Sequence, residues 1–141
     1  MKIERLEDIE AWQLAPVCRR TGRRELTRKV YRITKKPGLA KDYGLKRQIQ
    51  DAAGSSMHNI AEGFDSETNT KFILFLRYAK RSCTEVQSEP YVALDEEYIS
   101  PNEFKDVYEQ ARRIPRGGTA VRGFINYLKK YEKHKVTNRE P

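Results

Sequence analysis

The chain has 141 residues, of which 38% are hydrophobic and 34% charged, and its formal net charge is +8. This length suits one domain with a substantial core, and the composition is typical of a helical bundle with solvated outer faces. The N-terminus lacks the apolar run of a signal peptide and the longest apolar run, Phe72 to Leu76, is too short to span a membrane, so we expect a cytoplasmic protein without a membrane partner.

The charge is unevenly placed along the chain. Residues 1–50 hold 14 Lys and Arg against 6 Asp and Glu, residues 51–100 hold 4 against 9, and residues 101–141 hold 10 against 5. Basic ends around an acidic middle could serve a polyanionic partner, or could let subunits attract one another. The two cysteines, Cys18 and Cys83, stand far apart without a CxxC spacing, so we expect buried free thiols.

A first helix is predicted to begin after Asp8, an N-cap residue, and to continue to Ile33. Pro16 either kinks this helix or restarts it with proline in its first turn. Lys36-Pro37-Gly38 should end the helix, and Leu39 to Tyr43 should form a loop.

The outer side of this first helix carries arginines at four-residue steps: Arg20, Arg24, Arg28 and Arg32. A row of guanidinium groups rising about 6 Å per step could follow a phosphate backbone, because each group offers forked donors to phosphate oxygens. The alternative is a solvated face without a ligand. Further basic residues near the C-terminus could extend the row: Arg112, Arg113, Arg116, Arg122, Lys129, Lys130 and Lys133.

The central stretch from Leu45 to Phe64 has apolar residues at three- and four-residue steps, which predicts a helix that buries one face. Asn59 and Glu62 interrupt that face, so we expect both to be mostly buried and hydrogen-bonded to neighbouring helices. Gly63 is predicted to turn left-handed and end the helix.

A third helix should begin at Thr68, an N-cap, with a seam of apolar or small residues, and Pro90 should bend it. The members of the seam are Phe72, Leu76, Ala79, Cys83, Val86 and Ala93. The run from Ser100 to Glu103 is a start signal for a fourth helix, which Pro115 kinks or breaks.

No stretch alternates with a period of two for long enough to indicate a sheet. The sequence therefore predicts an all-α fold, an antiparallel up-and-down four-helix bundle over residues 1–132, with a polar tail over 133–141. Ile73, Tyr91 and Tyr127 lie on faces that one core would not fully use.

Catalytic and cofactor motifs are absent from the sequence. Ser55 and Tyr131 stand three residues before the two histidines, His58 and His134, so the Glu-x-x-His pairs of a di-iron bundle are missing. Zinc spacing, a P-loop, a dinucleotide fingerprint and a nucleophile elbow are missing too. We expect no catalytic residue, no metal and no cofactor, and hence no enzyme.

The central motif Asn59-Ile60-Ala61-Glu62-Gly63-Phe64, with Gln48-Ile49 and Ala52-Ala53 before it, resembles the hallmark of a bacterial family of four-helix-bundle proteins. The members are encoded in intervening sequences of 23S ribosomal RNA genes. The likeness extends through Leu6-Glu7-Asp8 and Tyr98-Ile99. It implies a homo-oligomer, with a pentamer favoured. A more distant branch of similar proteins binds nucleic acid as the accessory protein of diversity-generating retroelements.

These observations favour a non-enzymatic oligomer that associates with RNA or DNA through the first-helix arginines. The alternative is a protein-only scaffold or adaptor, whose charged faces bind subunits or a protein partner.

Overall fold

The structure, a computed structural model, describes residues 22–113 and residue 126. Residues 22–113 form the helices α2 (Arg23–Ile33), α3 (Pro37–Lys41), α4 (Tyr43–Phe64), α5 (Asn69–Ser88), α6 (Pro90–Asp95) and α7 (Pro101–Arg113). No strand occurs in this part of the chain. The all-α class predicted from the sequence is confirmed.

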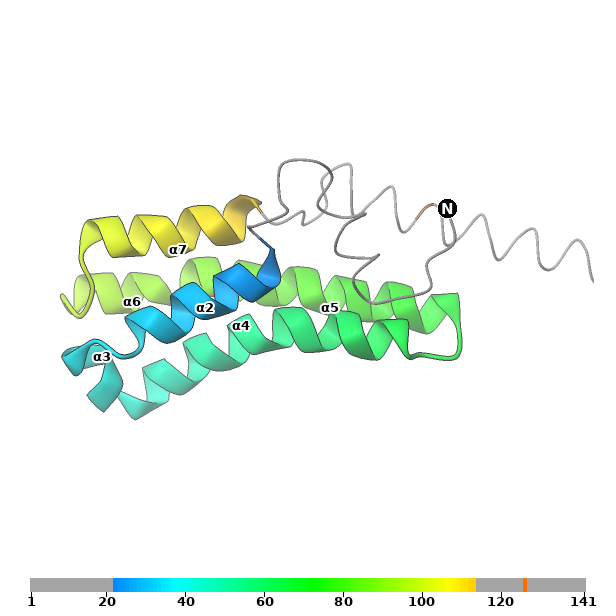
Figure 1. The fold of residues 1–141 in the computed structure, drawn as a ribbon, viewed down its shortest axis with the longest axis horizontal. Coiled ribbons are helices and arrows are strands. Elements are labelled where there is room, and N and C mark those ends of the chain that lie inside the picture. Colours follow the sequence, from blue (N-terminus) through cyan, green and yellow to red (C-terminus); the bar gives the residue numbers. More distant parts are fainter. Residues whose placement is uncertain (1–21, 114–125, 127–141) are drawn as a thin grey trace, which may run out of the picture.

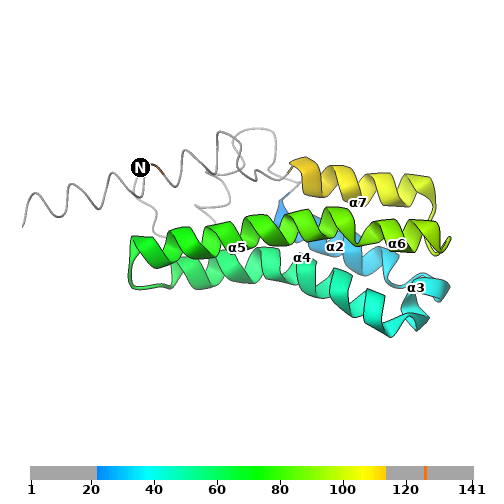
Figure 2. The same ribbon diagram turned by 180° about the vertical axis from the view of Figure 1, so that it is seen from behind.

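The four longest helices enclose one core. α4 and α5 form a hairpin, α2 packs against α4, α7 packs against α5, and α2 packs against α7 to complete the bundle. Consecutive members of this set run in opposite directions along the long axis (Figure 1), and the view from behind shows the same order (Figure 2). With 22 and 20 residues, α4 and α5 extend beyond α2 and α7 at one end of the bundle.

Apolar side chains at helical spacing fill the space between these helices. The seam predicted along the third helix is confirmed, because every member is at most 7% exposed: Phe72, Leu76, Ala79, Cys83, Val86 and Ala93. From α2, Leu26, Val30 and Ile33 belong to the same core cluster as Cys83, Val86 and Ala93 of this seam. Cys83 is a buried free thiol, as predicted, whereas Cys18 lies outside the described residues.

Two predicted helix starts are confirmed in atomic detail. The Thr68 side chain accepts a hydrogen bond from the Lys71 amide at 3.2 Å. Ser100 and Glu103 form a reciprocal pair, in which the Glu103 amide donates to Ser100 Oγ and the Ser100 amide donates to Glu103 Oε1. Each arrangement satisfies amides that a helix N-terminus would otherwise leave without partners.

Pro90 interrupts the third predicted helix. α5 ends at Ser88 and α6 begins at Pro90, which has no amide hydrogen to continue the ladder. Glu89 between them keeps helical backbone angles, and its backbone amide donates to the Glu85 carbonyl. The two helices lie on one line in both views. The proline therefore divides one long helical segment without redirecting it.

The connection between α2 and α4 differs from the predicted loop. The first helix ends at Ile33, but residues Pro37–Lys41 form the short helix α3, with proline at its first position. Gly38 is required there, because an added Cβ would lie 2.5 Å from the Tyr98 ring. Asp42 then caps α4 by accepting from the Leu45 amide and also accepts from the Tyr98 hydroxyl.

The predictions for the central motif need correction. Glu62 is exposed, because one residue of helix rotates it about 100° from buried Gly63. Asn59 is half-buried and donates to the Ser55 carbonyl of its own helix, not to a neighbour. Gly63 does not end α4, which continues to Phe64. The glycine is needed for close packing, since an added Cβ would lie 2.7 Å from Phe72 and 2.8 Å from Phe75.

Other predictions fall outside the described residues: the start at Asp8, the prolines Pro16 and Pro115, and the polar tail over 133–141. Of the apolar side chains expected outside the core, Tyr91 is 47% exposed, but Ile73 is 7% exposed and belongs to the buried set. Tyr127 lies outside the described part.

Candidate nucleic-acid interface

The outer face of α2 presents the arginine row predicted from the sequence. Arg24, Arg28 and Arg32 are all exposed, while Leu26 and Val30 between them are fully buried. The amphipathic period of the helix thus places these three cations on the side away from the core residues. Arg20, the first member of the predicted row, lies outside the described residues.

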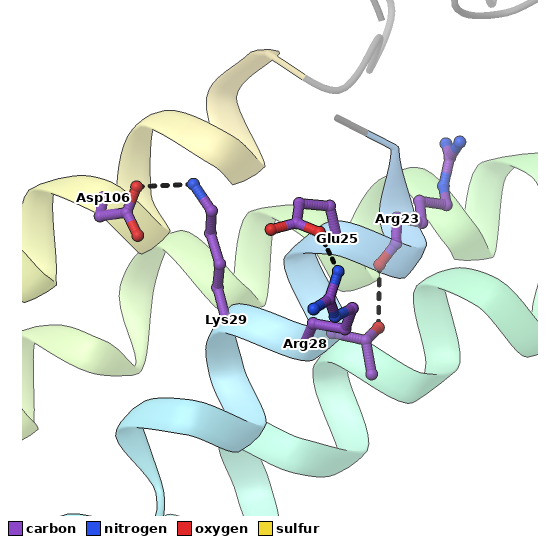
Figure 3. Close-up of polar contacts among 6 residues, drawn as sticks. Arg23, Glu25, Arg28, Lys29 and Asp106 are labelled. Carbon is purple, nitrogen blue, oxygen red and sulfur yellow. Dashed lines mark hydrogen bonds and ion pairs between the residues drawn. The ribbon is translucent and has the colours of Figure 1, made fainter. Parts of the chain in front are cut away.

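The exposed arginines differ in how they are held. Arg28 Nη1 lies 3.2 Å from Glu25 Oε2, an ion pair within α2 in which the Arg28 side chain stays 67% exposed (Figure 3). Such a surface pair contributes little free energy, so a phosphate could replace the carboxylate. Within the described part of the chain, Arg24 and Arg32 form no ion pair.

Two other basic residues of α2 serve the bundle. Lys29 Nζ lies 2.6 Å from Asp106 Oδ1 of α7, which ties the two helices together (Figure 3). Arg23 is only 2% exposed, and its carbonyl accepts from the Thr27 hydroxyl, which also reaches the Ala53 carbonyl of α4. The available cations of α2 are therefore those on its outermost line.

The C-terminal turn of α7 adds cations at one end of this row. Arg112 and Arg113 are exposed, and the end of α7 lies beside the start of α2 in both views. Arg112 binds Glu109 through Nε at 2.9 Å and Nη2 at 2.7 Å. This hydrogen bond lowers the pKa of Glu109 and raises the pKa of Arg112, so both stay charged at neutral pH. The other predicted members, from Arg116 to Lys133, lie outside the described residues.

A cluster of three carboxylates, from Asp51, Glu85 and Glu89, occupies a different part of the surface, where α4, α5 and α6 approach one another. Burial, then the charges of Glu85 and Asp51, raise the pKa of Glu89 from 4.5 to about 7. Glu89 Oε2 is buried and accepts no hydrogen bond within residues 22–113. Acidic and basic surfaces thus coexist on the described bundle.

Sequence reasoning missed a second set of basic residues, on α5 between Lys71 and Arg81. Lys71, Arg77, Lys80 and Arg81 are exposed there. Averaging charge over residues 51–100 hid them among nine carboxylates. The signal that could have revealed them is the absence of Asp and Glu from residue 68 to residue 84.

The described residues contain no group of three His, Cys, Asp or Glu side chains that could hold a metal ion. His58 is exposed on α4. Within the same part of the chain, no helix has the length and apolar character needed to cross a membrane.

Comparison with known proteins gives the family. The family model described as 23S rRNA-intervening sequence protein matches residues 7–117, which include all of the described helices and all four predicted arginines. The chain belongs to this family. The resemblance inferred from the central motif is therefore confirmed. Searches of curated proteins and of solved structures each found no match.

Proposed function

We propose that this member of the family is a non-enzymatic homo-oligomer that associates with nucleic acid, with α2 arginines holding phosphates. The observation that carries the proposal is the exposed line of Arg24, Arg28 and Arg32, of which only Arg28 has an intramolecular carboxylate partner among the described residues. A helix face with more cations than anions attracts a polyanion, and binding releases counterions.

Arginines that contact phosphates position a protein without reading bases, so binding should tolerate changes of sequence. It should also weaken steeply as salt rises, since each neutralised phosphate releases roughly 0.7–0.9 of a counterion. The proposed oligomer is a pentamer, on the strength of the family resemblance.

The test is a filter-binding titration of the full chain with RNA and with duplex DNA at two salt concentrations. The double variant Arg28→Gln/Arg32→Gln should lower affinity about equally for unrelated sequences and flatten the salt slope by about one to two. The matched control is Lys41→Gln/Arg47→Gln, which removes two exposed cations from α3 and α4. Equal losses in the variant and the control would contradict a specific role for α2.

A second candidate function is a protein-only scaffold, and the cluster of carboxylates from Asp51, Glu85 and Glu89 favours it. In that case the α2 arginines bind carboxylates of another subunit. Light scattering should then show that the double variant Arg28→Gln/Arg32→Gln no longer forms the oligomer. Its weak binding to nucleic acid should stay unchanged. A mass near 16.5 kDa for the wild-type chain at micromolar concentration would refute any homo-oligomer.

A further inference from the structure

The stretch of α5 from Lys71 to Arg81 concentrates positive charge in an otherwise acidic region. All four Lys and Arg of residues 51–100 fall between Lys71 and Arg81, and no Asp or Glu occurs between Glu67 and Glu85. This stretch of α5 lies where the α4–α5 hairpin extends beyond α2 and α7 (Figure 1). The nearby second half of α4, from Ala52 to Phe64, holds a single carboxylate, that of Glu62.

Exposed residues of both kinds, cationic and apolar, share one side of this helix. Lys71, Leu74, Arg77 and Arg81 recur at three- and four-residue steps and are exposed, with Leu74 at 43%. Phe72, Ile73 and Leu76 are buried on the other side. We call the outward side, with Tyr78 at its margin, the α5 strip: Lys71, Leu74, Arg77, Tyr78 and Arg81.

An aromatic and a guanidinium group are already stacked on the α5 strip. Arg81 Cζ lies 5.6 Å from the centroid of the Tyr78 ring, and Tyr78 is partly exposed. The Tyr78 ring packs edge-to-face with Phe75, at 5.9 Å between centroids and 87° between planes. Phe75 in turn packs over Gly63 of α4, where no larger residue would fit. The position of the Tyr78 ring is therefore set before any ligand arrives.

The charges of the α5 strip are not compensated within the described bundle. Lys71, Arg77 and Arg81 form no ion pair with any residue of 22–113, whereas Arg28 of α2 has Glu25 and Lys29 has Asp106. An external anion would meet these cations without first displacing a carboxylate. A polyanion with flat, apolar faces matches both halves of the strip, since phosphates suit the cations and bases suit the aromatic ring.

We propose that the α5 strip binds single-stranded nucleic acid, with a base stacking on the Tyr78–Arg81 pair and phosphates held by Lys71, Arg77 and Arg81. Only an unpaired base can offer its face to the ring, because a duplex keeps the faces of its internal bases stacked. This inference rests on the proposed association with nucleic acid but not on the α2 arginines, which lie on a helix that packs against α4 and α7.

The test compares single-stranded RNA of 20 nucleotides with a duplex of the same length, titrated against the full chain at two salt concentrations. Tyr78→Ala should weaken single-strand binding by about 5- to 150-fold, the effect of losing one stacked base, and should leave duplex binding within about twofold. Tyr78→Phe keeps the ring and should bind as the wild type does.

Because Tyr78 is partly buried, a second variant guards against misfolding. Arg77→Gln/Arg81→Gln changes two exposed side chains and should lower single-strand affinity and flatten the salt slope by about one to two, with Lys41→Gln/Arg47→Gln as the charge-matched control.

The outcomes separate this inference from the proposed function. If wild-type protein binds neither probe, both fail. If the α5 variants bind like wild type while Arg28→Gln/Arg32→Gln loses affinity, the α5 strip is refuted and the proposed function stands. Equal losses for single strand and duplex in Tyr78→Ala refute the stacking. If the α5 variants lose binding to polyglutamate or to anionic vesicles but bind RNA as the wild type does, a nucleic-acid ligand for the strip is refuted.

Discussion

Glu89 should make the stability of the bundle depend on pH in an unusual direction. Its carboxyl is held at the α5–α6 break, half-buried, near the carboxylates of Glu85 and Asp51, and its pKa is raised from 4.5 to about 7. An acid whose pKa is raised on folding binds a proton in the folded state that the unfolded chain has already lost. The contribution of Glu89 to the stability of the fold is therefore favourable below pH 4.5 and is lost as pH rises through about 7.

The size of the effect follows from that displacement. Without solvent screening, the displacement of the pKa from 4.5 to about 7 would correspond to about 3.4 kcal/mol of folding free energy. Solvent screening at a half-exposed carboxyl reduces this to about 1–2 kcal/mol. Glu89→Gln resembles the protonated acid, so it should raise the free energy of unfolding at pH 8 by about 1–2 kcal/mol and change it little at pH 4.5.

Urea denaturation of wild type and Glu89→Gln at pH 4.5, 6 and 8 measures this difference. Glu67→Gln, which removes an exposed carboxylate from the α4–α5 connection, is the control and should show no gain at pH 8. A Glu89→Gln protein that is less stable than wild type at pH 8, or equally shifted at pH 4.5 and pH 8, would refute the reasoning.

Two backbone predictions can be checked by thermal melts. Gly63→Ala should destabilise by about 1–3 kcal/mol, because the new methyl meets Phe72 and Phe75 below 3 Å, whereas Gly44→Ala, with open space around it, should stabilise by up to about 1 kcal/mol. Glu97 follows α6 in a turn where the Tyr98 amide donates back to the Ala93 carbonyl, and its φ of 59° is left-handed. Because glycine adopts this conformation without strain, Glu97→Gly should stabilise the fold by about 0.5–1 kcal/mol. An unchanged or lower melting temperature would contradict this.

The sequence predicted the fold well because local signals and packing agree over most of residues 22–113. The α5 seam, the Thr68 cap and the Ser100–Glu103 pair depend on spacing and short-range hydrogen bonds, which the sequence alone displays. At Pro90 the sequence predicted a bend, and this was wrong in direction: α5 and α6 are separated there but keep one line. The break itself follows because proline has no amide hydrogen to donate.

The central motif was misread because its roles depend on tertiary contacts. A glycine near a helix end is most often a cap, but Gly63 lies beneath two phenylalanines of α5, which no local pattern reveals. Glu62 falls just outside the buried arc, and a one-residue difference in helical phase decides between burial and exposure. The loop predicted before α4 became α3 because Leu39 is fully buried and holds that segment against the bundle.

The candidate site was predictable only in part. The four-residue spacing of arginines marked α2, and Arg24, Arg28 and Arg32 are exposed there. The Tyr78–Arg81 stacking and the raised pKa of Glu89 depend on side-chain geometry and on carboxylates from different helices, so neither could be read from composition.

The raised pKa of Glu89 also gives a way to separate the two proposed roles of the α2 arginines. A subunit contact between arginines and the carboxylates of Asp51, Glu85 and Glu89 needs Glu89 ionised, so it should weaken as pH falls from 8 to 6, through about 7. The phosphodiester groups of nucleic acid stay ionised over that range. Under the preferred proposal, the oligomer mass measured by light scattering is therefore the same at pH 8 and pH 6, and Glu89→Gln does not change it. A mass that falls at pH 6, and that Glu89→Gln or Arg28→Gln/Arg32→Gln lowers at pH 8 as well, would instead assign the arginines to subunit assembly.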